Sequence, residues 1–274
     1  MKKIIKKIKN GERLTDEEQL KMLEMPERGE LLELYVKKNY LSEAAEFKLL
    51  DLPERVELLE LYVQRFSLSD EALLKMLELP DAVRLLTIYI QEMGLNNDTE
   101  LKMFDLPERV VLLEMYMQLY GLGNEAQLKL FDLPEKVELL RMYISAGSCL
   151  CDEVQLKLFE LPEKVELLKM HISAGKWLCE EVQLKLFDLP ERVELLELYI
   201  VAGNYLSDEV QFKLFEMPER SELLEMYIRK HCLCAEAEVK LLGVPEKVKL
   251  LKMYLRKYAL SDEAEEKARE LGLM

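Results

Sequence analysis

Few side chains in this sequence could carry catalytic or metal chemistry. The 274 residues include two histidines, one tryptophan and five cysteines. Residues 231–234 (HCLC) offer the imidazole and thiolate ligands that zinc takes. Residues 121–123 (GLG) are interpreted as a loop rather than a dinucleotide fingerprint, and no nucleophile with a neighbouring general base is found. We therefore expect a protein that is not an enzyme and holds no cofactor.

The elements that must position any site come from a repeat of 27 or 28 residues. All nine prolines mark it, at positions 26, 53, 80, 107, 134, 162, 190, 218 and 245. A leucine stands twelve residues before each proline and a lysine five residues before it, and both recur in a partial last copy. Such spacing is the signature of a repeat array whose copies pack on their neighbours. We predict a single elongated domain over residues 1–274.

Each copy divides at its proline into two stretches with helical patterning. Residues 207–217 place apolar side chains about four residues apart and begin with a serine and two acids, which favours a helix start. The D/E-L-P-E box, such as residues 188–191, predicts a capping box and a second helix. That helix is apolar on most of its circumference, so we expect it to lie between neighbours. Glycine C-caps are predicted to end it in the longer copies, at Gly147, Gly175 and Gly203.

The predicted fold is all-α, a right-handed or similar α-solenoid of nine helical hairpins. Residues 1–13 are expected to form an N-terminal cap, residues 14–259 the hairpins, and residues 260–274 a polar C-terminal cap. The arrangement resembles the helical-hairpin solenoids of the TPR and HEAT class over the whole chain. Its periodic prolines and leucines are also similar to mitochondrial termination-factor repeats, which bind nucleic acid. The first resemblance implies a stacked array with an extended surface.

The net charge, the apolar runs and the cysteine count limit the kinds of partner and the cellular compartment that we expect. Acidic residues outnumber basic ones 53 to 38, for a net charge of −15, which opposes the phosphate neutralisation that nucleic-acid binding needs. No direct nucleic-acid contact is therefore expected. Because no apolar run approaches the ~18 residues of a membrane span, we expect no membrane contact either. An odd number of cysteines without a secretory leader fits the cytoplasm.

The repeat also argues against zinc. The cysteines outside residues 231–234 lie about three repeats away, on the order of 30 Å if helices stack at ~8–10 Å, so four ligands cannot converge. Cys151, Cys179 and Cys234 moreover take the place of a serine at a helix start. We interpret all five cysteines as reduced thiols.

Two series of side chains recur once per repeat. The lysine ladder could line an anion-binding track, but an acid usually precedes each lysine by four residues, the favoured order for a helical ion pair of ~0.2–0.5 kcal/mol. We favour a solvated structural ladder. The tyrosine ladder has helical spacing, which predicts buried rings with hydroxyls on backbone partners. The lysine ladder is Lys21, Lys48, Lys75, Lys102, Lys129, Lys157, Lys185, Lys213, Lys240 and Lys267; the tyrosine ladder is Tyr35, Tyr62, Tyr89, Tyr116, Tyr143, Tyr199, Tyr227 and Tyr254, with His171 standing in once as a core residue.

The candidate contact site lies in loops that follow the second helices. Most copies carry a large side chain there, and it either anchors a partner or plugs the end of its own hairpin. Three adjacent copies have one extra residue, at 147–149, 175–177 and 203–205, so three enlarged loops are expected side by side. The predicted partner-contacting residues are Trp177, Tyr205, Lys176, Asn204, Cys149 and Tyr120.

The function we predict is a non-enzymatic scaffold that binds a protein or peptide along an extended surface. One alternative is an acidic mimic of nucleic acid that inhibits a nucleic-acid enzyme. Another is an idealised repeat scaffold without a natural ligand, because neighbouring copies are nearly identical.

Overall fold

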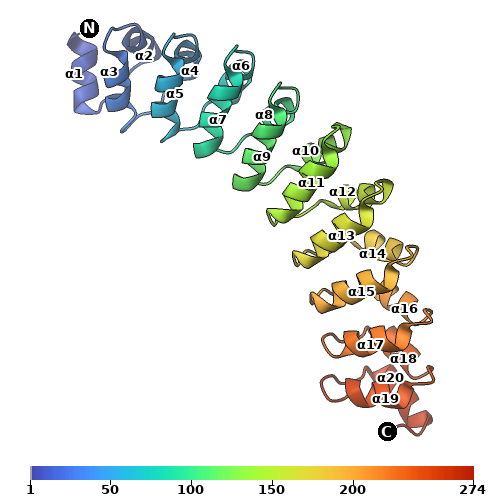
Figure 1. Cartoon of the computed structure of the whole chain (residues 1–274). Coiled ribbons are helices and arrows are strands. Elements are labelled where there is room, and N and C mark those ends of the chain that lie inside the picture. Colours follow the sequence, from blue (N-terminus) through green and yellow to red (C-terminus); the bar gives the residue numbers. More distant parts are fainter. Residues whose placement is uncertain (1) are drawn as a thin grey trace. The chain divides into compact units, whose positions relative to one another are not determined.

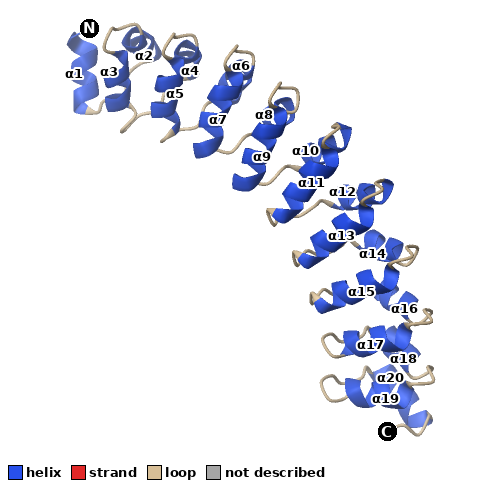
Figure 2. Ribbon diagram, viewed as in Figure 1, coloured by secondary structure: helices blue, strands red, loops and turns tan. Residues whose placement is uncertain are grey.

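The computed structural model describes residues 2–274, and all of the regular structure in that range is helical (Figure 2). Helix α1 spans Lys2–Asn10 and α20 spans Asp262–Glu270. The first helix of each hairpin is α2 (Asp16–Leu23), α4 (Glu43–Leu50), α6 (Asp70–Leu77), α8 (Asn97–Met103), α10 (Asn124–Lys129), α12 (Asp152–Lys157), α14 (Glu180–Leu186), α16 (Asp208–Leu214) or α18 (Ala235–Leu241). The second is α3 (Arg28–Tyr35), α5 (Arg55–Val63), α7 (Ala82–Glu92), α9 (Arg109–Leu119), α11 (Lys136–Ser145), α13 (Lys164–Ser173), α15 (Arg192–Val201), α17 (Arg220–Ile228) or α19 (Lys247–Tyr254). Single 3-10 turns, η1 (Leu130–Asp132) and η2 (Leu158–Glu160), continue α10 and α12.

The helices form two compact units, one ending at Leu139 and one beginning at Leu140. Within each unit the helices contact one another in two layers that follow chain order (Figure 1). In the first unit these layers are α2, α4, α6, α8, α10 and α1, α3, α5, α7, α9; in the second they are α12, α14, α16, α18, α20 and α13, α15, α17, α19. The predicted solenoid of helical hairpins is confirmed, and the single domain over residues 1–274 stays a prediction.

The terminal helices have the pattern that the sequence indicates. Helix α1 packs on α3 and buries Ile4 and Ile8, while its remaining residues are mostly lysine. Helix α20 packs on α18 through two buried alanines, Ala264 and Ala268, and is otherwise charged. Each terminal helix therefore covers the apolar face of its neighbour with a narrow apolar stripe, and its other side chains are mostly polar.

The second helices supply much of the core. Leu195 and Leu196 of α15 are both fully buried, although successive side chains of a helix point about 100° apart. Both can be buried because α15 lies between α13 and α17 in its own layer and also contacts α14. The apolar circumference of this helix thus reflects its position between neighbours.

The turn at the proline separates the two helices of a hairpin, but the predicted capping box is wrong. Glu191 occupies the N-cap of α15 and makes no side-chain cap hydrogen bond, and the helix begins at Arg192. The Arg192 N–H donates to the Leu189 carbonyl at 3.2 Å, which closes a tight turn around Pro190. The glutamate therefore stands at the N-cap, and not at the third helical position that a capping box requires.

The predicted glycine C-caps are confirmed. Gly147, Gly175 and Gly203 have φ of +79°, +72° and +86°, a region that glycine enters without strain. In the last of these loops the Asn204 N–H donates to the Tyr199 carbonyl at 3.3 Å, the long bond of a Schellman motif. Each enlarged loop therefore leaves its helix in a defined direction.

Replacing Leu195 with alanine should lower the free energy of unfolding by ~2–5 kcal/mol, because a fully buried side chain leaves a cavity between helices. Chemical denaturation followed by circular dichroism measures the change. Val201→Ala, a matched change at a side chain 56% exposed, should cost under ~0.5 kcal/mol. Equal effects of the two substitutions would contradict the assigned core.

Candidate functional site

The tyrosine ladder holds the loops in place. Tyr199 of α15 accepts the Leu178 N–H at 3.2 Å, and Tyr254 of α19 accepts the Leu233 N–H at 3.2 Å. In each case the leucine stands at the end of the loop that leads from the preceding hairpin into the first helix of its own hairpin. Burial raises the pKa of Tyr199, as it raises the pKa of Tyr89 to about 12, so these hydroxyls stay neutral. The predicted buried rings are confirmed. The predicted backbone partners of the hydroxyls are confirmed for six members of the ladder, Tyr35, Tyr62, Tyr116, Tyr143, Tyr199 and Tyr254.

A second buried series was missed by the sequence analysis. It lies seven residues before the proline on the first helices, and we name it the amide ladder. Gln155 accepts the Cys179 N–H of the next hairpin at 2.9 Å, and its amide donates to the Leu150 carbonyl at 3.0 Å. The members are Gln19, Glu46, Glu100, Gln127, Gln155, Gln183, Gln211 and Glu238, all of them buried. Leu73 of α6 takes this position in one copy.

The sequence did contain a signal for this series. Gln211 stands between Val210 and Phe212 and is polar, yet it is only 5% exposed. A polar residue that recurs at one position beside the apolar stripe of every hairpin but one is the pattern of a buried hydrogen-bonding group.

Three members of the amide ladder are glutamates, and their surroundings differ. Glu46 accepts the Tyr62 hydroxyl at 2.9 Å and the Ser69 N–H at 2.9 Å. Glu100 accepts the Gly123 N–H at 3.0 Å, and burial raises the pKa of its carboxyl. Glu100 is therefore an ionisable group held away from water at the junction of two hairpins.

The lysine ladder connects neighbouring hairpins. The Lys75 ammonium lies 2.7 Å from the Asp51 carboxylate, donates to the Phe47 carbonyl at 3.2 Å and sits 4.9 Å from the centre of the Phe47 ring. The other ladder pairs to a preceding hairpin are Lys48 with Glu24 (3.3 Å), Lys129 with Asp105 (3.3 Å) and Lys240 with Glu216 (3.9 Å). For Lys75, Lys129 and Lys240 the predicted partner, an acid four residues earlier on the same helix, is wrong, because the adjacent first helix of the layer lies within reach of the long side chain. Lys48 has Ala44 at that position, so no such partner was predicted for it.

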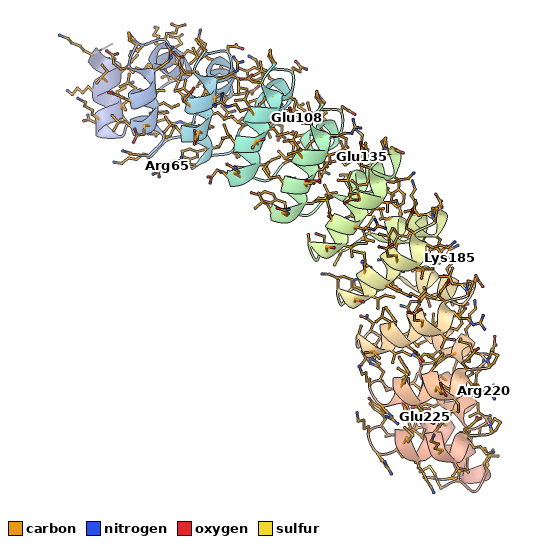
Figure 3. The ribbon with its side chains drawn as sticks, in the orientation of Figure 1. Arg65, Glu108, Glu135, Lys185, Arg220 and Glu225 are labelled. Atoms are coloured by element: carbon orange, nitrogen blue, oxygen red, sulfur yellow. The ribbon has the colours of Figure 1, made fainter. Side chains whose placement is uncertain are left out.

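Charged rows on the second helices are also paired between hairpins. Arg141 lies 2.9 Å from Glu166, and Lys169 lies 2.6 Å from Glu194. Glu225, which is labelled in Figure 3, pairs with Lys249. In every case a residue seven after one proline meets a residue four after the next. The base stands on the earlier hairpin in two of these pairs and on the later hairpin in the third. Each pair nevertheless joins one base to one acid.

The enlarged loops expose their aromatic side chains. Trp177 is 54% exposed and Tyr205 is 63% exposed, and Cys149 is also exposed. Lys176 and Asn204 in the same loops are half-buried. Five of the predicted contact residues therefore lie on three successive loops of one unit.

The large loop residues occupy two different positions, which the sequence analysis had grouped together. Phe66 and Tyr120 stand four residues after a ladder tyrosine and lie against its ring, at centroid distances of 5.8 and 5.3 Å. They plug their own hairpins. Trp177 and Tyr205 stand directly before the invariant leucine, six residues after His171 and Tyr199, and more than half of each is exposed. The sixth predicted contact residue, Tyr120, is half-buried and belongs to the other unit.

Both histidines contact residues of the enlarged loops. His171 is fully buried, and its Nε2 lies 3.2 Å from the Trp177 carbonyl, so this histidine holds the enlarged loop that carries the tryptophan. His231 lies between the rings of Tyr205 (4.2 Å) and Tyr227 (5.0 Å). Burial lowers the pKa of both histidines, which favours neutral imidazoles.

Residues 2–274 contain no group of three or more histidine, cysteine or acidic side chains placed to hold a metal ion. No disulfide joins the cysteines in that range. Within the same residues, no helix has the length and apolar character needed to cross a bilayer.

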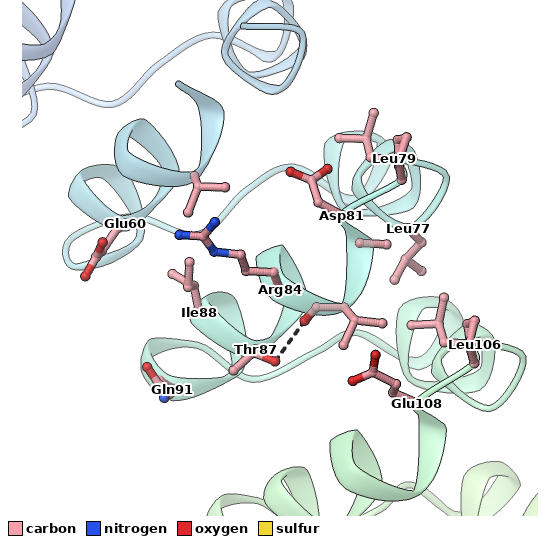
Figure 4. Close-up of a pocket in the computed structure, with 15 residues that line it drawn as sticks. Glu60, Leu77, Leu79, Asp81, Arg84, Thr87, Ile88, Gln91, Leu106 and Glu108 are labelled. Atoms are coloured by element: carbon pink, nitrogen blue, oxygen red, sulfur yellow. Dashed lines mark hydrogen bonds between the residues drawn. The ribbon is translucent and has the colours of Figure 1, made fainter. Parts of the chain in front are cut away.

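The first unit holds a pocket of about 880 Å³ between α5, α7 and the start of α9 (Figure 4). Apolar side chains such as Val83, Ile88 and Leu106 line it. Its polar residues include Glu60 and Arg84 at one end and Glu108 at the other (Figure 4). No contact had been predicted here, although Arg84 visibly interrupts the row of acids four residues after the proline.

No protein-family model matches this chain, and comparison with curated proteins and with solved structures likewise finds no match. Its function is therefore inferred from its own geometry.

We expect acrylamide to quench Trp177 readily in the folded protein, with an emission maximum close to that of a solvated indole, because half of this side chain is open to water. Trp177 is the only tryptophan, so the signal needs no assignment. A blue-shifted emission that resists quenching would mean that Trp177 plugs its hairpin as Phe66 does.

Glu100→Gln should stabilise the protein increasingly as the pH rises from 4 to 8. Because burial raises the pKa of Glu100 in the folded state, its stabilising contribution is complete below the unfolded pKa and is lost as the pH rises through the folded value. Glutamine cannot ionise, and it fills the same position in five other hairpins. Urea unfolding of both proteins at several pH values measures the difference, with Glu125→Gln at an exposed acid as the control. A difference independent of pH would contradict the burial of this charge.

Proposed function

We propose that this protein is a non-enzymatic scaffold that binds a protein or peptide, with its enlarged loops as the main contact. The observation that carries the proposal is the exposure of Trp177 and Tyr205 on successive loops whose backbones are fixed. Exposed tryptophan and tyrosine side chains are the commonest anchors of protein interfaces. Both offer a large contact area at a small cost in side-chain entropy.

The rigidity of these loops supports the proposal. Each begins at a left-handed glycine, and Leu178, which ends the middle loop, donates its N–H to the Tyr199 hydroxyl. The Trp177 carbonyl is additionally held by His171. A binding surface that is ordered before contact loses less entropy on association.

The two alternative functions have weaker support. Mimicry of nucleic acid requires unpaired carboxylates, whereas Glu166, Glu194 and Glu225 already pair with basic side chains of neighbouring hairpins. An idealised scaffold would repeat its loops and helix faces, whereas this chain varies them between copies around a constant core.

The test is a peptide library displayed on phage and selected on the immobilised full-length chain. Peptides that bind should lose about tenfold in affinity to Trp177→Ala and to Tyr205→Ala, the cost of a typical anchor. Calorimetry with the synthetic peptides measures the loss. Tyr40→Ala is the matched control, because Tyr40 stands at the same loop position, directly before Leu41, and is 49% exposed.

Two results would contradict the proposal. One is a failure to select any peptide, and the other is a set of peptides whose affinity both substitutions leave unchanged. An affinity that instead collapses with rising salt would favour the acidic mimic, because exposed charges are screened and an aromatic contact is not.

A further inference from the structure

The pocket of the first unit is the space left by a missing basic side chain. The residue two after the proline is arginine or lysine in every hairpin except one: Arg28, Arg55, Arg109, Lys136, Lys164, Arg192, Arg220 and Lys247, against Ala82. Ala82 opens helix α7 and lines the pocket.

At other junctions an arginine fills the equivalent place. Arg28 reaches Glu54 at 2.6 Å, and Arg55 reaches Asp81 through three hydrogen bonds of 2.7–3.0 Å. In both pairs the acid stands one residue after the next proline. The two arginine side chains are only 22% and 23% exposed, so each lies largely inside the structure, between successive second helices. The same pairing joins Arg109 to Glu135 (3.7 Å) and Arg192 to Glu219 (3.8 Å).

At the junction between the hairpin that contains Ala82 and the next hairpin, the acid is present but its basic partner is missing. Glu108 stands one residue after Pro107, and within residues 2–274 its carboxylate makes no ion pair or hydrogen bond. Glu108 lies at one end of the pocket, next to Leu106 (Figure 4). One junction along the chain, Glu135 holds the corresponding place with Arg109 as its partner (Figure 3).

The remaining charges of the pocket favour a cation. Asp81 already pairs with Arg55, so the lining leaves two further acids, Glu60 and Glu108, and one base, Arg84. Arg84 lies at the end away from Glu108, beside Glu60 (Figure 4). Apolar side chains between the two ends, such as Val83 and Leu106, suit the methylene chain of an incoming arginine.

We propose that this pocket binds an arginine side chain of a partner peptide or protein, with its guanidinium on Glu108. The incoming arginine takes the place that Arg28 and Arg55 take in their own junctions, and a guanidinium matches a carboxylate through two parallel hydrogen bonds. This inference rests on the proposed function only in that the arginine belongs to a bound peptide or protein.

A small arginine derivative tests the pocket without the rest of a partner. The full chain is labelled at alanine methyl groups, and the Ala82 signal is assigned from its absence in Ala82→Arg. Titration with Nα-acetyl-L-arginine amide should shift this signal in a saturable way with a Kd in the millimolar range, about 1–10 mM. The citrulline analogue has the same shape without the charge and should cause no saturable shift.

Three variants separate the pocket from general attraction to an acidic protein. Glu108→Gln should weaken binding about tenfold, the loss expected for a hydrogen bond to a charged group. Glu135→Gln removes the corresponding acid of a junction that Arg109 already fills, and it should change nothing. In Ala82→Arg the chain's own side chain should occupy the pocket, and the shift that the arginine derivative causes at the Ile88 methyl group, labelled in a second sample of both proteins, should disappear.

The proposal is overturned if the arginine derivative gives no saturable shift, if citrulline binds equally well, or if Glu108→Gln and Glu135→Gln have the same effect. Peptides that still bind through Trp177 in that case would leave the proposed function intact. A pocket that binds the arginine derivative in a chain that selects no peptide would overturn the proposed function and leave the arginine specificity of the pocket standing.

Discussion

Successive hairpins are held in register by a side-chain oxygen that accepts the N–H at the start of the next hairpin. The first N–H groups of a helix and of the turn before it have no partner within the helix. In this array those groups face the neighbouring hairpin, so a buried acceptor such as Gln155 must meet them. Because the same amide donates back to Leu150, the contact leaves neither of its own polar groups without a partner. The tyrosine hydroxyls, the loop directions and the exposed aromatic side chains all depend on this register.

The fold follows from features that are local in sequence. A proline every 27 or 28 residues separates two helices, and apolar spacing gives each helix its buried face. Gly147, Gly175 and Gly203 end the second helices of the three 28-residue copies because their backbone must turn left-handed. These features identify helices, breaks and a stacked architecture before any coordinates are known. The predicted capping box was wrong because the residue spacing cannot tell where, after a proline, the first helical residue falls.

Contacts between hairpins could not be assigned from the sequence. Periodicity places Lys75 on a helix face but does not say whether Asp51 of the neighbouring helix or Glu71 of its own helix is nearer. Trp177 and Tyr205 were identified because an added residue and an aromatic side chain are visible in the sequence. The pocket was not predicted because it forms where a basic side chain is missing, at Ala82. The acid that this leaves without a partner, Glu108, stands 26 residues later in the sequence.

Leu73 interrupts the amide ladder in the hairpin that also contains Ala82. The N–H of Asn96, which begins the following hairpin, therefore has no amide-ladder acceptor, and Asn96 reaches back to Asp70 only through its own side chain, at 2.6 Å. In a linear array each hairpin contributes its own stability and the energy of its two interfaces, so a poorer interface is where cooperativity fails first. Partial unfolding should begin at this junction, and the array should behave there as two segments whose amides exchange with solvent at different rates.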